Sequence, residues 1–285
     1  MRQRPVESPR RTTRPANGGR FMDKPAFEGI DYEEEDGIGV VTIRGGKMNS
    51  FTEAVTDDLP KLADYLYESI DSDLRVVIFR GEVDVFSTGA DMSIFEQEMT
   101  PQEFRMLNKT LPDFYDDLED LEIPTVAAIT GPCIGGGLEL AIACDIRIAT
   151  EEATFGFPEN KIGLIPGTGG CSRFVKLVGY GTAKETILTG EIIGAKRADK
   201  EGLVNRVVDD DEVMDEAYDV AESITKKAPV ATGLAKRIIR AGVDADMRTG
   251  GVIESLTQSL LVQTEDHEEG LEAFREKRDA DFEGR

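Results

Sequence analysis

Tryptophan, histidine and cysteine are scarce or missing in this chain of 285 residues, and each scarcity narrows the possible chemistry. There is no tryptophan, and the single histidine, His267, argues against a histidine base or a metal site built from several histidines. The three cysteines, Cys133, Cys144 and Cys171, show no C-x-x-C spacing. An odd number of unpaired cysteines fits a reducing compartment. We therefore expect a cytoplasmic protein without a metal centre, whose cysteines are small buried hydrophobic residues.

Long hydrophobic runs and an excess of basic charge are also missing. The most apolar stretch, residues 125–144, is interrupted by Pro132, three glycines and Glu139, so it predicts a buried core segment rather than a membrane helix. Acidic residues outnumber basic ones by 56 to 33, and the net charge of −23 argues against a nucleic-acid partner. Proteins of salt-loving organisms use such an acidic excess to stay dissolved. We expect a halophilic source; an ordinary acidic enzyme is the alternative.

Residues 1–21 carry the opposite charge. Six arginines against one glutamate give this segment +5, which leaves −28 for residues 22–285. The segment contains prolines, has few apolar residues and lacks the hydrophobic core of a signal peptide. We interpret residues 1–21 as a disordered basic N-terminal extension, with Met22 as a plausible start. A basic tail that binds a partner is the alternative.

Four short β-branched runs, bounded by glycine or charge, predict buried strands. They are residues 38–44, 75–81, 124–130 and 145–150. Between the first two, residues 52–70 place apolar side chains at helical spacing, with Thr52 as a candidate cap. Strands that alternate with helices indicate right-handed crossover units and a largely parallel sheet. The fold class predicted for the core, residues 22–200, is therefore α/β.

The last part of the chain has a different pattern, with apolar residues at helical spacing and few strand signals. Four successive amphipathic helices are predicted. They are residues 211–228, 230–242, 250–264 and 265–282. We interpret residues 201–285 as a helical C-terminal cap and oligomerisation region.

Three consecutive glycines, Gly135 to Gly137, follow the strand predicted at 124–130 and open a helix. A second glycine-containing turn, residues 82–95, follows the strand at 75–81. A strand that turns into a helix through glycine presents unpaired backbone N–H groups, and two such groups that converge would form an oxyanion hole. Tight packing of a strand against a helix is the alternative. A phosphate loop is a further option, but the G-x-x-x-x-G-K-[ST] motif is missing.

Two carboxylates occur in apolar surroundings. Glu139 lies one turn inside the helix that the glycines open, between Leu138 and Leu140, and Glu159 lies in a loop rich in proline and glycine. Burial disfavours the charged form of a carboxyl group and raises its pKa towards neutral values. Two such groups could carry out paired acid–base chemistry on a water molecule. A capped or salt-bridged structural carboxylate is the alternative for each.

Five motifs together resemble the crotonase superfamily and, within it, enoyl-CoA hydratases most closely. They are FSTGADM (86–92), GPCIGGGLELAIACDIRIAT (131–150), FGFPENKIGLIPGTGGCSRF (155–174), GLVNRVV (202–208) and TEDHEEGLEAFREKR (264–278). The resemblance covers residues 28–285. It implies a crotonase-like spiral core of ββα units with a helical C-terminal region.

The resemblance also implies roles for particular residues. The backbone N–H groups of Ala90 and Gly136 would form the oxyanion hole, and Glu139 and Glu159 would be the catalytic acids and bases. The acyl-CoA substrate would be bound by Ala90, Gly136 and several further residues. They are Asp91, Met92 and Ser93 along the coenzyme A arm, Phe157 and residues 92–111 around the acyl chain, and Lys277 as a weaker candidate for a phosphate on a neighbouring subunit.

The leading interpretation is therefore reversible addition of water to a 2-enoyl-CoA, with no cofactor besides the coenzyme A of the substrate. Two alternatives stay open at this point. One is an enoyl-CoA isomerase or another crotonase-type reaction, against which the presence of two glutamates counts. The other is a non-catalytic binding module. The resemblance further implies a homo-trimer or homo-hexamer.

Overall fold

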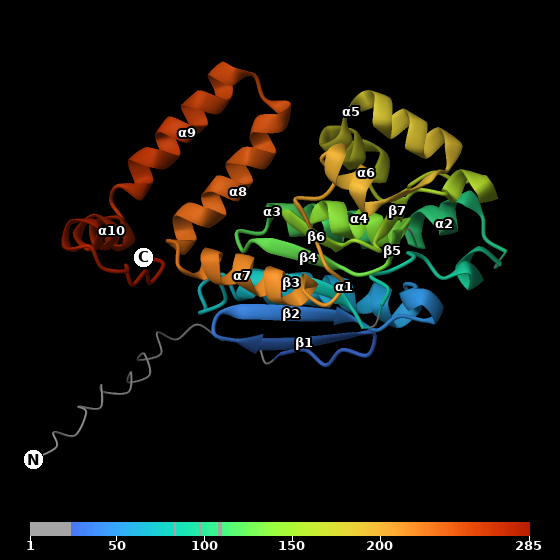
Figure 1. The fold of residues 1–285 in the computed structure, drawn as a ribbon, viewed down its shortest axis with the longest axis horizontal. Helices are drawn as coiled ribbons and strands as arrows, with labels where there is room; N and C mark the ends of the chain where they lie inside the picture. The colour runs from blue at the N-terminus through green and yellow to red at the C-terminus, as the bar shows by residue number, and fades with distance from the viewer. Residues whose placement is uncertain (1–23, 83, 97, 108–109) are drawn as a thin grey trace, which may run out of the picture.

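The computed structural model describes residues 24–285 except 83, 97, 108 and 109. The predicted basic extension, residues 1–21, lies outside the described residues. The described chain combines a six-stranded sheet, a three-stranded sheet and helices on both faces of the larger sheet (Figure 1). The α/β class and the helical C-terminal region predicted from the sequence are confirmed.

The larger sheet has the strand order β1-β2-β3-β4-β6-β9, and only the pair β1 and β2 is antiparallel. Its strands are β1 (Ile30–Glu35), β2 (Ile38–Ile43), β3 (Val76–Gly81), β4 (Thr125–Ile129), β6 (Ile146–Thr150) and β9 (Arg206–Val208). All five residues of β4 are buried, because helices cover both faces of the sheet. The four strands predicted from β-branched runs correspond to β2, β3, β4 and β6.

Alternation along the strands divides the core into two layers. Val77 and Phe79 of β3 face the larger cluster, which they share with α1 (Glu53–Glu68), α3 (Thr110–Asp120) and α4 (Gly136–Ala143). Val76 and Ile78 face the opposite side, where α7 (Val213–Thr225) covers them. Strand β9 and helix α7 lie within residues 201–285, the predicted helical cap and oligomerisation region, yet both belong to the layers of the sheet. The three residues of β9 are too few to show a periodic pattern.

The second sheet is small and joins the larger one at the glycine-rich turns. It has the order β5-β7-β8, with β5 and β7 parallel and β8 antiparallel to β7. Its strands are β5 (Pro132–Ile134), β7 (Thr154–Gly156) and β8 (Ile192–Gly194). The connecting helices are η1 (Lys47–Asn49), η2 (Met92–Glu96), α2 (Pro101–Leu107), η3 (Glu159–Ile162), α5 (Gly170–Thr189) and α6 (Ala195–Lys200).

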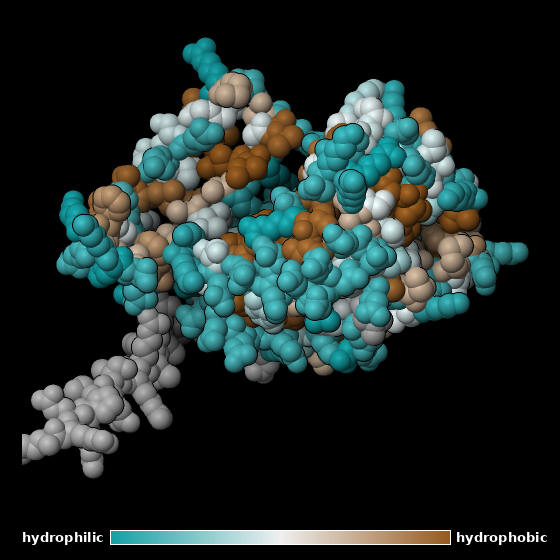
Figure 2. Space-filling view, in the orientation of Figure 1, coloured by the Kyte–Doolittle hydropathy of each residue, from teal (hydrophilic) through white to brown (hydrophobic). Residues whose placement is uncertain are grey.

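Helices α8 (Pro229–Asp244), α9 (Met247–Leu261) and α10 (Glu265–Glu276) extend away from the sheets on one side of the molecule (Figure 1). Their faces carry large exposed hydrophobic side chains, which Figure 2 shows as brown surface along α8 and α9. Leu256 and Leu260 of α9 are 63% and 66% exposed. None of the described helices is long and apolar enough to cross a membrane.

Candidate active site

Three segments run in the same direction into one small region. Ser87 forms a parallel bridge with Cys133, and β5 is parallel to β7. The carboxyl ends of parallel neighbours meet at the same edge of a sheet. The residues that follow these three ends are Ala90, Gly136 and Glu159, so segments far apart in the sequence deliver the predicted oxyanion-hole and acid–base residues to one place.

The glycines allow the first two of these segments to touch backbone against backbone. A Cβ atom on Gly89, whose φ is +77°, would collide with the backbone nitrogen of Gly136. A Cβ atom on Gly137 would collide with the carbonyl oxygen of Ser87. Gly136 has more room, because a Cβ atom there would lie 3.6 Å from the nitrogen of Ala90. Tight packing thus explains Gly89 and Gly137, whereas at Gly136 the closest contact of a Cβ atom would be 3.2 Å, to Cα of Gly89.

The backbone N–H groups of Ala90 and Gly136 are free within the described part of the chain. Phe51 donates to the carbonyl of Gly89 (2.7 Å) and accepts from the nitrogen of Asp91 (3.2 Å), which directs the N–H of Ala90 away from Phe51. Gly136 is the first residue of α4, so its N–H has no acceptor inside the helix. Two free N–H groups side by side can bind a carbonyl oxygen that gains negative charge.

Glu139 is almost completely buried, with 4% of its surface exposed. Its Oε1 accepts from the backbone nitrogens of Thr168 (2.8 Å) and Gly170 (2.9 Å), and its Oε2 accepts from Oγ1 of Thr168. Both oxygens therefore act as acceptors, the role of an ionised carboxylate. Three donors fix the position of this group, and the carboxylate keeps acceptor capacity for one more partner.

Glu159 opens η3 and is half-buried beside the glycine turn. Its Oε2 is buried and has no hydrogen-bond partner within the described residues. Its Oε1 would lie 3.1 Å from a Cβ atom on Gly135, so only glycine leaves ordinary space for this carboxyl group. Burial, with a smaller contribution from the negative charge of Glu139, raises the pKa of Glu159 to about 7. Such a group can both donate and accept a proton near neutral pH.

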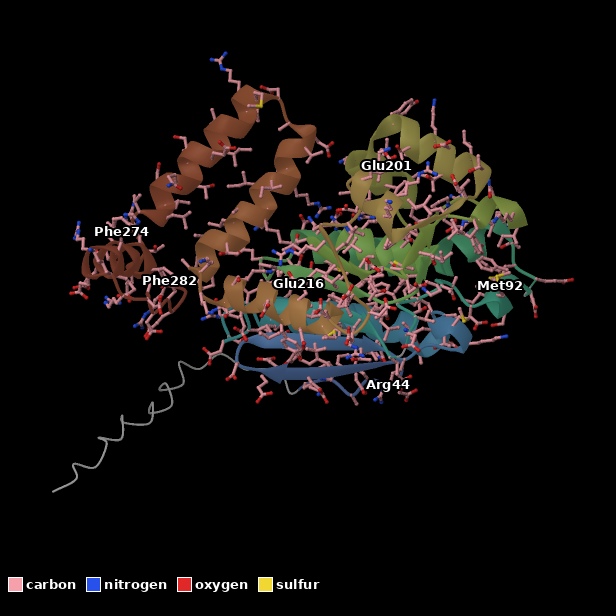
Figure 3. The ribbon with its side chains drawn as sticks, in the orientation of Figure 1. Arg44, Met92, Glu201, Glu216, Phe274 and Phe282 are labelled. Carbon is pink, nitrogen blue, oxygen red and sulfur yellow. The ribbon has the colours of Figure 1, made fainter. Side chains whose placement is uncertain are left out.

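The turn after Ala90 is built by hydrogen bonds to Asp91. The carboxylate of Asp91 accepts from the backbone nitrogen of Ser93 (2.9 Å) and from Oγ of Ser50 (2.9 Å), and hydrogen bonds from Ser93 and Ser50 lower the pKa of Asp91. Met92 is 55% exposed and lies at the edge of the molecule (Figure 3). The stretch predicted to bind the coenzyme A arm therefore follows the free N–H of Ala90 onto an open surface.

Two predicted substrate-binding residues lie elsewhere. Phe157 has no exposed surface and packs edge to face against Phe174, with ring centroids 5.2 Å apart. This corrects its expected place in the acyl-chain pocket: aromatic packing places its ring in the core. Lys277 follows the last residue of α10 and has a φ of +57°. Phe274 of the same helix lies at the opposite side of the molecule from Met92 (Figure 3). Lys277 does not join the site of its own chain.

Sequence reasoning did not single out Thr168, Tyr115 or Arg173. Thr168 supplies two of the three hydrogen bonds to Glu139, and the glycine-rich stretch PGTGG around it was the available signal. Tyr115 is fully buried, and its hydroxyl donates to the carbonyl of Gly136 (3.1 Å).

Within the described residues, no cluster of three or more His, Cys, Asp or Glu side chains could hold a metal ion.

Comparisons with known proteins identify the family of this chain. The profile of the family described as enoyl-CoA hydratase/isomerase matches residues 33–285. The chain is 41% identical over 228 residues to the probable mitochondrial enoyl-CoA hydratase 2 of Arabidopsis thaliana, covering 79% of this chain and 75% of that protein. It is 39% identical over 252 residues to the short-chain-enoyl-CoA hydratase of Clostridium acetobutylicum, covering 87% and 95%. It is 36% identical to the human mitochondrial methylglutaconyl-CoA hydratase, covering 90% and 77%.

Solved structures give the same result for the fold. The crystal structure of enoyl-CoA hydratase from Bacillus anthracis superimposes with a TM-score of 0.86 at 34% identity, covering 90% of this chain and all of that one. The resemblance to the crotonase superfamily is confirmed. The chain belongs to the enoyl-CoA hydratase/isomerase family.

Proposed function

We propose that this enzyme is a hydro-lyase that adds water reversibly to the double bond of a 2-enoyl-CoA. The observation that carries the proposal is the pairing of two glutamates, Glu139 and Glu159, beside the two free N–H groups of Ala90 and Gly136. The hydratase names of the relatives in Arabidopsis and Clostridium support it. No cofactor is proposed besides the coenzyme A of the substrate.

The chemistry follows from the positions of these groups. The thioester oxygen accepts hydrogen bonds from the N–H groups of Ala90 and Gly136, which stabilise the negative charge of the enolate. A water molecule gives one proton to Glu139, and its oxygen bonds to C3 of the substrate. The π electrons of the double bond form the new C2–H bond with the proton of Glu159. The pair of glutamates has the same total proton count before and after the addition.

A one-carboxylate isomerase is the second candidate. One observation favours it: Glu139 already accepts three hydrogen bonds, as a structural carboxylate would, which leaves Glu159 to move a proton alone. Incubation with crotonyl-CoA separates the two functions. A hydratase consumes the conjugated thioester absorbance and forms 3-hydroxybutyryl-CoA, detected by chromatography. An isomerase acts on 3-enoyl-CoA substrates and leaves crotonyl-CoA without the hydroxylated product, which would overturn the proposal.

The pKa of Glu159 predicts the pH dependence of the reaction. Addition of water needs one proton on the glutamate pair, and burial places the loss of the proton of Glu159 at about pH 7. We expect kcat/KM to fall about tenfold per pH unit above this value, because the proton donor is then lost. The dehydration direction needs the same single proton, so its alkaline limb should coincide. A kcat/KM that stays constant from about pH 7 to about pH 9 would contradict the assignment to Glu159.

We also propose that the enzyme is a homo-trimer or homo-hexamer. The exposed hydrophobic side chains of α9, among them Leu256 and Leu260, are the surface that supports association of copies. In such an assembly Lys277 would reach a substrate phosphate bound by another subunit, because its helix α10, marked by Phe274, lies far from Met92 in its own chain (Figure 3).

Salt should control this assembly. With a net charge of −23 per chain, copies repel one another when screening is weak, and the Debye length grows from about 3 Å at 1 M to about 30 Å at 0.01 M salt. Sedimentation equilibrium in molar KCl should give three or six times the chain mass of 31.2 kDa, with dissociation in dilute buffer. An unchanged mass across this range would contradict the expectation that charge limits association.

A further inference from the structure

The position of Glu139 depends on a short loop, residues 168–170, whose last residue is the first of α5. All three donors to its carboxylate come from this loop: the nitrogen and the hydroxyl of Thr168, and the nitrogen of Gly170. Gly169 between them has a φ of +99°, which only glycine adopts readily. Whatever fixes the loop 168–170 therefore fixes the carboxylate.

One side chain holds this loop from outside. Nη1 of Arg173 donates to the carbonyl oxygen of Thr168 (3.0 Å). A Cβ atom on Gly169 would collide with the same Nη1, so the guanidinium lies directly against the loop backbone. The guanidinium carbon also lies 5.9 Å from the ring centroid of Tyr115, whose hydroxyl donates to the carbonyl of Gly136. Arg173 thus contacts the supports of both the acid–base carboxylate and the proposed oxyanion-hole glycine.

The guanidinium is held in turn by carboxylates of α3. Arg173 bonds Asp116 (2.6 Å) and Glu119 (2.9 Å), and its side chain is only 12% exposed. An arginine fork that bonds two carboxylates and a carbonyl has one defined orientation, unlike a lysine ammonium. Arg240 of α8 lies near the same two carboxylates, at 3.4 Å from each, and bonds Asp120 in addition. No hydrogen bond joins Arg240 to the loop 168–170 in the described chain.

We propose that Arg173 is a positioning residue for Glu139, acting through the loop 168–170. The inference rests on the proposed function, because it assumes that Glu139 accepts the proton of the attacking water. Loss of the bond to Thr168 lets the loop and the carboxylate move away from the water. The binding of acyl-CoA is not affected, because Arg173 touches none of the residues proposed to bind it.

The test compares Arg173→Gln, Arg173→Lys and Arg240→Gln in the full-length enzyme. Arg240→Gln is the matched control, since it removes an arginine from the same carboxylates but leaves the loop contact intact. A cavity of about 490 Å³ borders both arginines. Solvent therefore fills the space that a shorter side chain leaves, and no empty void forms. Thermal unfolding is measured for each variant so that rates are compared only for folded protein.

With crotonyl-CoA, Arg173→Gln should lower kcat by about 10-fold to 100-fold with KM within about twofold, since a misplaced base weakens only proton transfer. Arg173→Lys should recover part of this loss, and Arg240→Gln should stay within about twofold of the wild type. Equal losses in Arg173→Gln and Arg240→Gln, or a loss that appears in KM alone, would overturn the proposal. If Arg173→Gln does not fold, the kcat of Arg173→Lys is compared with that of Arg240→Gln. A lower kcat in Arg173→Lys supports the proposal, and equal kcat values would overturn it.

A failure of the proposed function has a different signature. If the wild-type enzyme does not hydrate crotonyl-CoA, the assay says nothing of Arg173, and the positions of the atoms decide instead. Crystal structures of the wild type and of Arg173→Gln should then differ in the place of the Glu139 carboxylate and of the loop 168–170. An unmoved carboxylate in the variant would overturn the positioning role, whatever the substrate is.

Discussion

Glu159→Gln is expected to lower kcat for hydration of crotonyl-CoA by at least about 10²-fold, with little change in KM. Glutamine has the shape of glutamate but cannot give a proton to C2. Burial raises the pKa of Glu159 to about 7, so the neutral amide also reproduces the charge that the glutamate has when it is protonated. The unfolding temperature should therefore stay close to that of the wild type.

Glu139→Gln should cause a loss of the same size for a different reason. The amide oxygen can replace Oε1 and accept from the nitrogens of Thr168 and Gly170. The amide NH₂ can donate to Oγ1 of Thr168 once that hydroxyl rotates. The fold is kept, but no group takes the proton of the water. A large fall in unfolding temperature, with activity falling only in proportion to folded protein, would indicate a structural role.

A control and the double variant complete this experiment. Glu201 accepts from Oγ1 of Thr182 (2.8 Å), which repeats the threonine–glutamate contact outside the proposed site, so Glu201→Gln should keep full activity. The double variant of Glu139 and Glu159 should be little worse than the poorer single variant, because both residues act on one water molecule. If Glu159→Gln is nearly fully active while Glu139→Gln is inactive, the two-carboxylate mechanism is wrong.

The parts of the fold that the sequence predicts are those with a strong repeating pattern. Strands β2, β3, β4 and β6 are short runs rich in β-branched residues, because helices bury both faces of the sheet. Strands β5, β7 and β8 have three residues each, too few for any periodicity. They exist because neighbouring segments pair with them, and it is these short strands that bring Glu159 to Gly135. Local patterns do not contain this information.

The residues around the site also fall into two groups: those that the sequence alone predicts and those that only the contacts in the fold reveal. Three consecutive glycines at the start of a helix and a glutamate in an apolar segment are unusual locally, so the sequence alone draws attention to Gly136, Glu139 and Glu159. Phe157 is an apolar residue in an apolar segment, and only its contact with Phe174 decides that it belongs to the core rather than to a pocket wall. Arg173 resembles an exposed charge near a helix start, and the carboxylates that bury it lie more than fifty residues earlier.

The role of the Gly136 N–H can be tested by removing the hydrogen itself. Gly136 is the first residue of α4, a position at which proline is tolerated because its N–H has no partner in the helix. Gly135 before it has a ψ of −127°, outside the helical region that a following proline disfavours. Gly136→Pro therefore keeps the start of the helix and deletes one donor of the proposed oxyanion hole.

Gly136→Ala is the matched control, because alanine adds the same Cβ atom but keeps the N–H. That Cβ atom would lie 3.2 Å from Cα of Gly89, a close contact that both variants share. Loss of one oxyanion donor typically costs about 10²-fold to 10³-fold in kcat, so Gly136→Pro should be slower than Gly136→Ala by that factor. The ratio is taken from kcat with crotonyl-CoA, at equal folded fraction by thermal unfolding. Equal rates of the two variants would mean that the thioester oxygen does not bind at the start of α4, and the proposed mechanism would lose its electrostatic component.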